Sequence, residues 1–162
     1  MTKIAFIGAT RGCALETLVR VLQDEAEGTT ECYVLSRRPE EFSKHLLEER
    51  KIDPKAYPNL TIIAGDALVE ESLFSFLSTA AGSQTLDQIV FSLGGKPVFN
   101  RGFLKAPGLE PANVCERGAR NLFAALKKLA LSKQPRLITV SSSGIGDFGH
   151  SIVPFGLKQL CE

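Results

Sequence analysis

A glycine-rich turn near the N-terminus has the residue types and the spacing to bind phosphate groups. It follows a short apolar run at residues 3–7 and precedes apolar residues at helical spacing, Leu15, Leu18, Val19 and Leu22. The turn therefore lies where a strand ends and a helix begins. There a dinucleotide pyrophosphate can meet free backbone N–H groups and the positive end of the helix dipole. We expect this phosphate cradle to consist of Gly8, Thr10, Gly12, Cys13 and Ala14.

Three of these residues have separate expected roles. Gly8 allows a tight turn, Gly12 lets the backbone approach the phosphates, and Ala14 is small enough for the helix to lie against its strand. The spacing is G-x-x-x-G-x-A, which differs from the G-x-G-x-x-G fingerprint of dinucleotide-binding folds. A glycine-rich strand-to-helix turn without a ligand is therefore the alternative.

Arginines follow the second predicted strand, at the position where NAD-binding folds carry an acidic residue for the ribose 2′-hydroxyl. Arg37 and Arg38 offer planar guanidinium donors instead, and these suit a ribose 2′-phosphate. Arg11, inside the glycine-rich turn, can point the same way. The three arginines predict NADP (NADPH) as the cofactor, and the alternative for each of them is a solvated surface charge.

Polar and small residues also follow the third and fourth predicted strands. Asp66, with Ala67 beside it, is expected to accept a hydrogen bond from the adenine amino group. The same aspartate is an equally good candidate for the N-cap of the third helix. Leu93, Gly94 and Gly95 are expected beside the nicotinamide ribose, and a plain turn explains the two glycines about as well.

Three serines end the fifth predicted strand, near the expected position of the nicotinamide ring. A hydroxyl of Ser141, Ser142 or Ser143 can donate to a substrate carbonyl that gains negative charge during hydride transfer. A serine-rich turn without a catalytic role is the alternative. His150 and Lys158 are the downstream groups with proton-transfer chemistry, and we expect the histidine to be solvated.

The elements that position these residues alternate between short apolar runs and helical repeats. Strands are predicted at residues 3–7, 32–35, 60–64, 89–93 and 137–140, with helices between them. The expected apolar faces are Phe42, Leu46 and Leu47 in the second helix, Leu73, Phe76, Leu77 and Ala80 in the third, and Cys115, Ala119, Leu122, Leu126 and Leu129 in the fourth, which begins at Pro111. This alternation predicts an α/β Rossmann-like three-layer sandwich, whose parallel five-stranded sheet has the order 3-2-1-4-5. Ligand sites gather at the carboxyl ends of such strands, beside the switch point between the first and fourth. Residues 96–111 show no period, so we expect a long loop there.

Composition and charge restrict the class of protein. Residues 1–162 are expected to form a single domain, since 44% hydrophobic and 23% charged residues are ordinary for a globular protein. A formal net charge of +1 gives no reason to expect nucleic acid or an anionic membrane as a partner. We expect neither a transmembrane span nor a signal peptide. The four cysteines are far apart, so we expect reduced thiols, a cytoplasmic location and no metal site.

The motifs that follow four of the strands resemble those of the atypical short-chain dehydrogenases and reductases. They are Gly8-Ala9-Thr10-Arg11-Gly12-x-Ala14, Arg37-Arg38-Pro39, Gly65-Asp66 and Ser141-Ser142-Ser143-Gly144. Within that family, residues 2–147 look like the NmrA-like NAD(P)-binding group, which also includes flavin and biliverdin reductases. The resemblance implies a Rossmann fold and NADP(H) binding. The group contains both reductases and redox-sensing regulators that bind the dinucleotide without turnover.

Two departures from the family bear on activity. Ordinary short-chain dehydrogenases carry a Tyr-x-x-x-Lys pair after the fifth strand, whereas the tyrosines here, Tyr33 and Tyr57, lie far upstream. Family members also continue well past that strand, so we expect the substrate-binding C-terminal part to be missing or reduced. Our leading hypothesis is an NADPH-dependent oxidoreductase that transfers hydride to a small carbonyl or conjugated organic substrate. The alternatives are an NADP(H)-binding regulatory or non-catalytic protein and a degenerate fragment.

Overall fold

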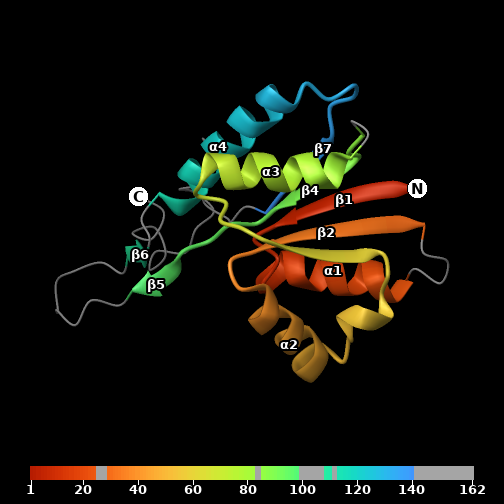
Figure 1. Ribbon diagram of the computed structural model, residues 1–162. Helices are drawn as coiled ribbons and strands as arrows, with labels where there is room; N and C mark the ends of the chain where they lie inside the picture. Colours follow the sequence, from red (N-terminus) through yellow and green to blue (C-terminus); the bar gives the residue numbers. More distant parts are fainter. Residues whose placement is uncertain (25–28, 83–84, 99–107, 111–112, 141–162) are drawn as a thin grey trace, which may run out of the picture.

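The chain alternates strands and helices along most of its length (Figure 1). The computed structural model describes residues 1–24, 29–82, 85–98, 108–110 and 113–140. In chain order the elements are β1 (Thr2–Ile7), α1 (Gly12–Asp24), β2 (Thr30–Ser36), α2 (Pro39–Arg50), the 3₁₀ helix η1 (Pro54–Ala56), β3 (Leu60–Ala64), α3 (Glu70–Ala81), β4 (Gln88–Phe91), β5 (Lys96–Val98), β6 (Gly108–Glu110), α4 (Val114–Leu129) and β7 (Arg136–Thr139).

Five of the strands form one parallel sheet in the order β3-β2-β1-β4-β7. The central strand is β1, in which Ile7 lies opposite Leu35 of β2 and opposite Phe91 of β4. The predicted order 3-2-1-4-5 is therefore confirmed, with β7 as the fifth predicted strand. The order reverses between β1 and β4, where the switch point was expected.

Helices cover both faces of this sheet, which gives three layers (Figure 1). On one face α1 and α2 pack around Phe6 and Val34, and on the other face α3 and α4 pack around Ala5 and Ile7. Successive residues of β1 join opposite clusters because side chains along a strand point alternately to the two faces. Since both faces are covered, the central strands are continuous apolar runs.

Burial confirms the predicted apolar faces of two helices and corrects those of the other two. All four apolar positions predicted for α1 and for α3 are buried, namely Leu15, Leu18, Val19, Leu22, Leu73, Phe76, Leu77 and Ala80. In α2 only Phe42 and Leu46 of the predicted face are buried, and Leu47 is 49% exposed. In α4 the buried face consists of Val114, Gly118, Leu122 and Ala125, whereas Cys115 is exposed.

The face of α4 differs from the prediction because the helix approaches its neighbours through a small residue. A Cβ atom at Gly118 would lie 2.2 Å from Cδ1 of Leu93, so only glycine allows this approach without a shift. The apolar repeat in the sequence predicts instead that the larger side chains of the helix form its buried face. Ala119, Leu126 and Leu129 are only partly buried at the margin of the cluster.

The connection after β4 differs from the predicted loop. β4 ends at Phe91, two residues before the predicted end at Leu93, and α4 begins at Val114 instead of Pro111. Between them β5 and β6 pair antiparallel in a separate two-stranded sheet, with Pro97 opposite Leu109. Strands of three residues are too short to show the alternation that identifies a strand in a sequence, which explains why they were missed.

Two further expectations concern thiols and membranes. Cys13, Cys32 and Cys115 are free, as expected, and Cys161 lies outside the described residues. Among the helices that the structure describes, none combines the length and the apolar character needed to cross a bilayer.

Candidate functional site

The carboxyl ends of the parallel strands bring most of the predicted site residues to one edge of the sheet. The backbone N–H of Ser92, just after β4, donates to the carbonyl of Ile7 at the end of β1 (2.9 Å). In the same way Gly65, just after β3, donates to Ser36 at the end of β2 (2.9 Å). The segments that follow β1, β2, β3 and β4 therefore leave the sheet at the same edge, as the sequence predicts.

The glycine-rich turn has two glycines with left-handed backbone, and each has a different reason for being glycine. Gly8 has φ +85°, and a Cβ atom there would lie 2.3 Å from the carbonyl oxygen of Ser92. Glycine at position 8 is therefore required by the close contact with the segment after β4 as well as by the predicted turn. Gly12 has φ +70°, and a Cβ atom there would have no neighbouring atom within 4 Å, so its surface is open to a ligand. Ala14 is fully buried, as its expected packing on β1 requires.

Among the α-helices of the described ranges, α1 is the one whose first turn carries no acidic side chain. The first turns of the other α-helices in the described part of the chain carry Glu40 and Glu41 in α2, Glu70 and Glu71 in α3, and Glu116 in α4. Such carboxylates compensate the positive end of a helix dipole. The positive end of the α1 dipole therefore has no carboxylate in its own first turn to compensate it. The exposed residues around it are Thr10, Arg11, Gly12 and Cys13.

The two arginines after β2 are both exposed but differ in their contacts. Arg38 Nη1 lies 3.0 Å from Oε2 of Glu41, an ion pair at the surface. Its backbone N–H donates to Oγ of the buried Ser36 (3.2 Å). Within the described ranges Arg37 has no carboxylate at ion-pair distance, so its guanidinium is the freer of the two. Binding of a 2′-phosphate by Arg37 or Arg38 stays a prediction, and the contacts of the two residues favour Arg37.

Asp66 closes its own turn, and the prediction that it caps the third helix is wrong. Its Oδ1 accepts a hydrogen bond from the backbone of Leu68 (2.9 Å), and its backbone N–H donates to Oγ of Ser72 (2.9 Å). The N-cap of α3 is Val69. Aspartate side chains readily bond the backbone two residues further on, and this short-range bond prevails over the cap. Ala67, beside it, is buried.

The segment after β4 touches α4. The carbonyl of Leu93 accepts a hydrogen bond from Sγ of Cys115 (3.0 Å), and Gly94 is exposed with open space around it. A second α4 side chain, Asn121, donates from Nδ2 to the carbonyl of Ala67 (3.1 Å). Sequence reasoning placed neither α4 residue in the site. The sequence signal for Asn121 is a polar amide next to the apolar face of an amphipathic helix.

The remaining predicted residues cannot be placed at this edge. Ser141, Ser142, Ser143, His150 and Lys158 all lie outside the described residues. β7, which leads toward the serines, ends at Thr139, and Thr139 pairs with Phe91 at the carboxyl end of β4.

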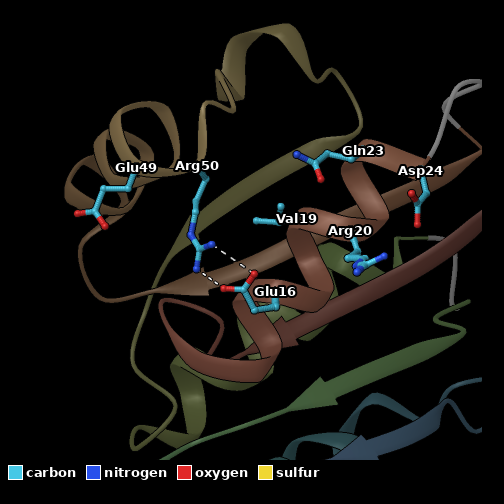
Figure 2. Close-up of a pocket in the computed structure, with 7 residues that line it drawn as sticks. All are labelled: Glu16, Val19, Arg20, Gln23, Asp24, Glu49 and Arg50. Atoms are coloured by element: carbon cyan, nitrogen blue, oxygen red, sulfur yellow. Dashed lines mark hydrogen bonds and ion pairs between the residues drawn. The ribbon is translucent and has the colours of Figure 1, made fainter.

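A hollow of about 390 Å³ lies elsewhere, between α1 and α2, and contains none of the predicted site residues. Its lining comprises Glu16, Val19, Arg20, Gln23, Asp24, Glu49 and Arg50. Figure 2 shows Arg50 reaching from α2 toward Glu16 of α1, with which it forms an ion pair. A smaller hollow of about 220 Å³ lies over β2 and β3, lined by Met1, Glu31, Tyr33, Pro58, Asn59 and Thr61. In the larger hollow Arg50 is neutralised by Glu16, and in the smaller one the Tyr33 hydroxyl donates to Glu31.

No protein-family model matches the sequence, and no curated protein matches it either. Solved structures do match the fold. A tyrosine-to-phenylalanine variant of ElxO with NADPH bound has a TM-score of 0.64 at 19% identity, over 98% of this chain and 63% of that one. A mutant short-chain dehydrogenase/reductase of Serratia marcescens has a TM-score of 0.62 at 18% identity, over 98% and 61%. The chain therefore has the Rossmann-like α/β fold of these structures.

Two further matches carry the same fold. The menthone neomenthol reductase of Mentha piperita has a TM-score of 0.62 at 16% identity, over 89% of this chain and 62% of that one. The RhlG/NADP complex of Pseudomonas aeruginosa has a TM-score of 0.52 at 19% identity, over 98% and 62%. The chain thus spans about three fifths of the length of these solved structures. At these identities the likeness identifies the fold, and the NmrA-like group stays a prediction.

Proposed function

We propose that this chain binds NADPH along the carboxyl edge of its sheet and acts in an NADPH-dependent oxidoreductase. The observation that carries the proposal is a helix start without acidic side chains beside a guanidinium that has no carboxylate partner among the described residues. The first turn of α1 lacks acidic side chains and has the open Gly12 at its start, and Arg37 follows the adjacent strand β2. Phosphate groups are the natural ligand of such an arrangement.

Each part of the dinucleotide has a candidate partner in this fold. The pyrophosphate is bound by backbone N–H groups between Gly8 and Ala14, and the 2′-phosphate by Arg37. The adenine lies against the segment at Asp66 and Ala67, and the nicotinamide ribose against Leu93, Gly94 and Gly95. The structural neighbours ElxO and RhlG, which carry NADPH or NADP, support the choice of cofactor.

In the proposed reaction NADPH supplies the hydride, and the protein orients it and stabilises charge. The substrate is a small carbonyl or conjugated organic compound that gains negative charge as the hydride arrives. A hydroxyl of Ser142, or of its neighbours Ser141 and Ser143, donates a hydrogen bond to that charge. Such donors act most strongly when they are held in place before the reaction.

A second function is favoured by one specific observation. Neither tyrosine lies near the carboxyl end of β7, since Tyr33 is in β2 and Tyr57 follows η1. The proton donor of ordinary short-chain dehydrogenases thus has no counterpart among the tyrosines of this sequence. The second candidate is an NADP(H)-binding regulatory or non-catalytic protein of the NmrA-like type.

Calorimetric titration of NADPH and of NADH into the purified protein tests NADPH binding, which both candidate functions require. We expect NADPH to bind more tightly than NADH, and equal affinities or no binding would contradict the proposed site. Incubation with NADPH and a panel of quinones, flavins and aldehydes then separates the candidates. Oxidation of NADPH by any member of the panel supports the oxidoreductase, and tight binding without oxidation supports the regulator.

A further inference from the structure

Two side chains of α4 bond to backbone carbonyls in two separate segments of the proposed cofactor edge. Asn121 Nδ2 donates to the carbonyl of Ala67, in the segment after β3, at 3.1 Å. Cys115 Sγ donates to the carbonyl of Leu93, in the segment after β4, at 3.0 Å. The contacts join residues 54 and 22 positions apart in the sequence, so they depend on how α4 is docked.

The packing of α4 makes it a firm support for these two segments. Leu122 and Ala125 are buried in the same cluster as Ala67 and Phe91. Gly118, between the two donors, allows the helix to approach Leu93 more closely than any other residue would. Side chains that position a ligand site are most effective when they extend from a packed helix or strand.

We propose that Asn121 is a positioning residue for the adenine end of the cofactor. Its amide holds the Ala67 carbonyl and thereby fixes the turn that presents the neighbouring Asp66 carboxylate. Cys115 supports the nicotinamide side of the same edge, although more weakly because a thiol is a poor donor. This inference rests on the proposed NADPH binding and adds a residue outside the phosphate cradle to it.

The proposal has a signature that distinguishes Asn121 from the arginines. NADPH and NADH carry the same adenine, so loss of the Asn121 amide lowers the affinity for both by the same factor. Loss of the Arg37 guanidinium lowers the affinity for NADPH alone. The ratio of the two affinities is therefore unchanged in an Asn121 variant and reduced in an Arg37 variant.

The test compares Asn121→Leu with the matched control Asn59→Leu. Each change keeps the approximate size of the side chain, removes an amide donor and adds no charge; Asn59 Nδ2 donates to the carbonyl of Thr30 (2.9 Å) at the start of β2. Asn59 is also partly buried but lies away from the proposed site. We expect both variants to melt at lower temperature. Only Asn121→Leu should bind both nucleotides more weakly, by roughly five-fold or more, as expected from a lost hydrogen bond.

A double-mutant cycle with Asp66→Ala provides a readout that a purely structural role would not produce. If Asn121 acts by placing Asp66, the double variant binds NADPH little more weakly than Asp66→Ala alone. Should Asn121→Leu fail to fold, the smaller uncharged variant Asn121→Ala replaces it in the same measurements. Equal nucleotide affinity in the Asn121 and Asn59 variants, or fully additive losses in the cycle, overturns the inference alone. Wild-type protein that binds neither nucleotide overturns the proposed function together with it.

Discussion

The carbonyl oxygen of Ser92 lies 2.3 Å from the position that a Cβ atom would occupy at Gly8. The two residues follow the neighbouring parallel strands β4 and β1, and Ser92 also donates from its backbone to Ile7 (2.9 Å). The contact is between backbone groups, so no rotation of a side chain can relieve a clash. The close approach of these two segments therefore requires glycine at position 8.

The first prediction compares Gly8→Ala with Gly12→Ala. Both residues have positive φ, so each variant loses about 1–2 kcal/mol of stability from backbone strain. Only Gly8→Ala adds the clash with Ser92, which should cost roughly 1–3 kcal/mol more. Urea unfolding of the two variants and the wild type measures the difference. Equal losses of stability in the two variants would show that the Ser92 contact does not restrict position 8.

The second prediction concerns the preference for NADPH. Arg37→Ala should weaken NADPH binding by roughly ten- to a hundred-fold, because a hydrogen bond to a charged group contributes about 1.5–3 kcal/mol. Arg38→Ala is the matched control and should have the smaller effect, since Arg38 already pairs with Glu41. Calorimetric titration of NADPH and NADH into both variants measures this, with NADH affinity unchanged throughout. A larger effect from Arg38→Ala would assign the 2′-phosphate contact to Arg38 instead of Arg37.

The third prediction is that salt erodes this preference. Arg37 is exposed, so its attraction for the 2′-phosphate is screened by mobile ions. The ratio of NADPH to NADH affinity should fall steadily as the concentration of sodium chloride rises in the wild type. In Arg37→Ala the ratio should respond much less. A wild-type ratio that is independent of salt would place the source of the preference in a buried group.

The fourth prediction concerns the serines after β7, which lie outside the described residues. If Ser142 donates to the substrate in the transition state, Ser142→Ala should lower kcat by roughly a hundred-fold, the usual cost of losing one such donor. NADPH affinity should stay close to that of the wild type. Ser141→Ala and Ser143→Ala, measured with the same substrate, serve as controls. Unchanged turnover in all three variants would refute a catalytic role for these serines.

The fifth prediction is a loss of stability at alkaline pH that depends on Tyr33. Burial raises the pKa of Tyr33 above its ordinary value of 10.0, and the hydrogen bond to Glu31 (3.0 Å) and its negative charge act in the same direction. The folded protein therefore keeps this proton when the unfolded chain has already lost it. The stability from Tyr33 is fully present below pH 10.0 and is lost as the pH rises through the raised pKa.

Urea unfolding on both sides of pH 10.0 checks this prediction. The free energy of unfolding of Tyr33→Phe should fall less steeply with pH than that of the wild type. The same slope in both proteins would assign the alkaline loss of stability to other groups.

The sequence by itself determined the sheet and the edge at which the predicted site residues gather. The apolar runs of β1, β2, β3, β4 and β7 and the helical repeats between them are local patterns, and right-handed crossovers leave few ways to assemble them. Local patterns also placed Gly12 at a helix start and Arg37 directly after a strand, and both positions are confirmed, whereas their binding of phosphate stays a prediction. Neither the fold nor the direction of the strands had to be corrected.

Only the tertiary structure decided which distant groups meet at that edge. The bond from Asn121 to Ala67, the bond from Cys115 to Leu93 and the contact of Gly8 with Ser92 each join residues far apart in the chain. They depend on the rotation and depth at which α4 docks and on the spacing of β1 and β4. Periodicity shows that a helix has an apolar side. The approach of Gly118 to Leu93 shows which way that side of α4 faces in the folded protein. That is the physical reason why Asn121 could not be placed in the site before the structure was known.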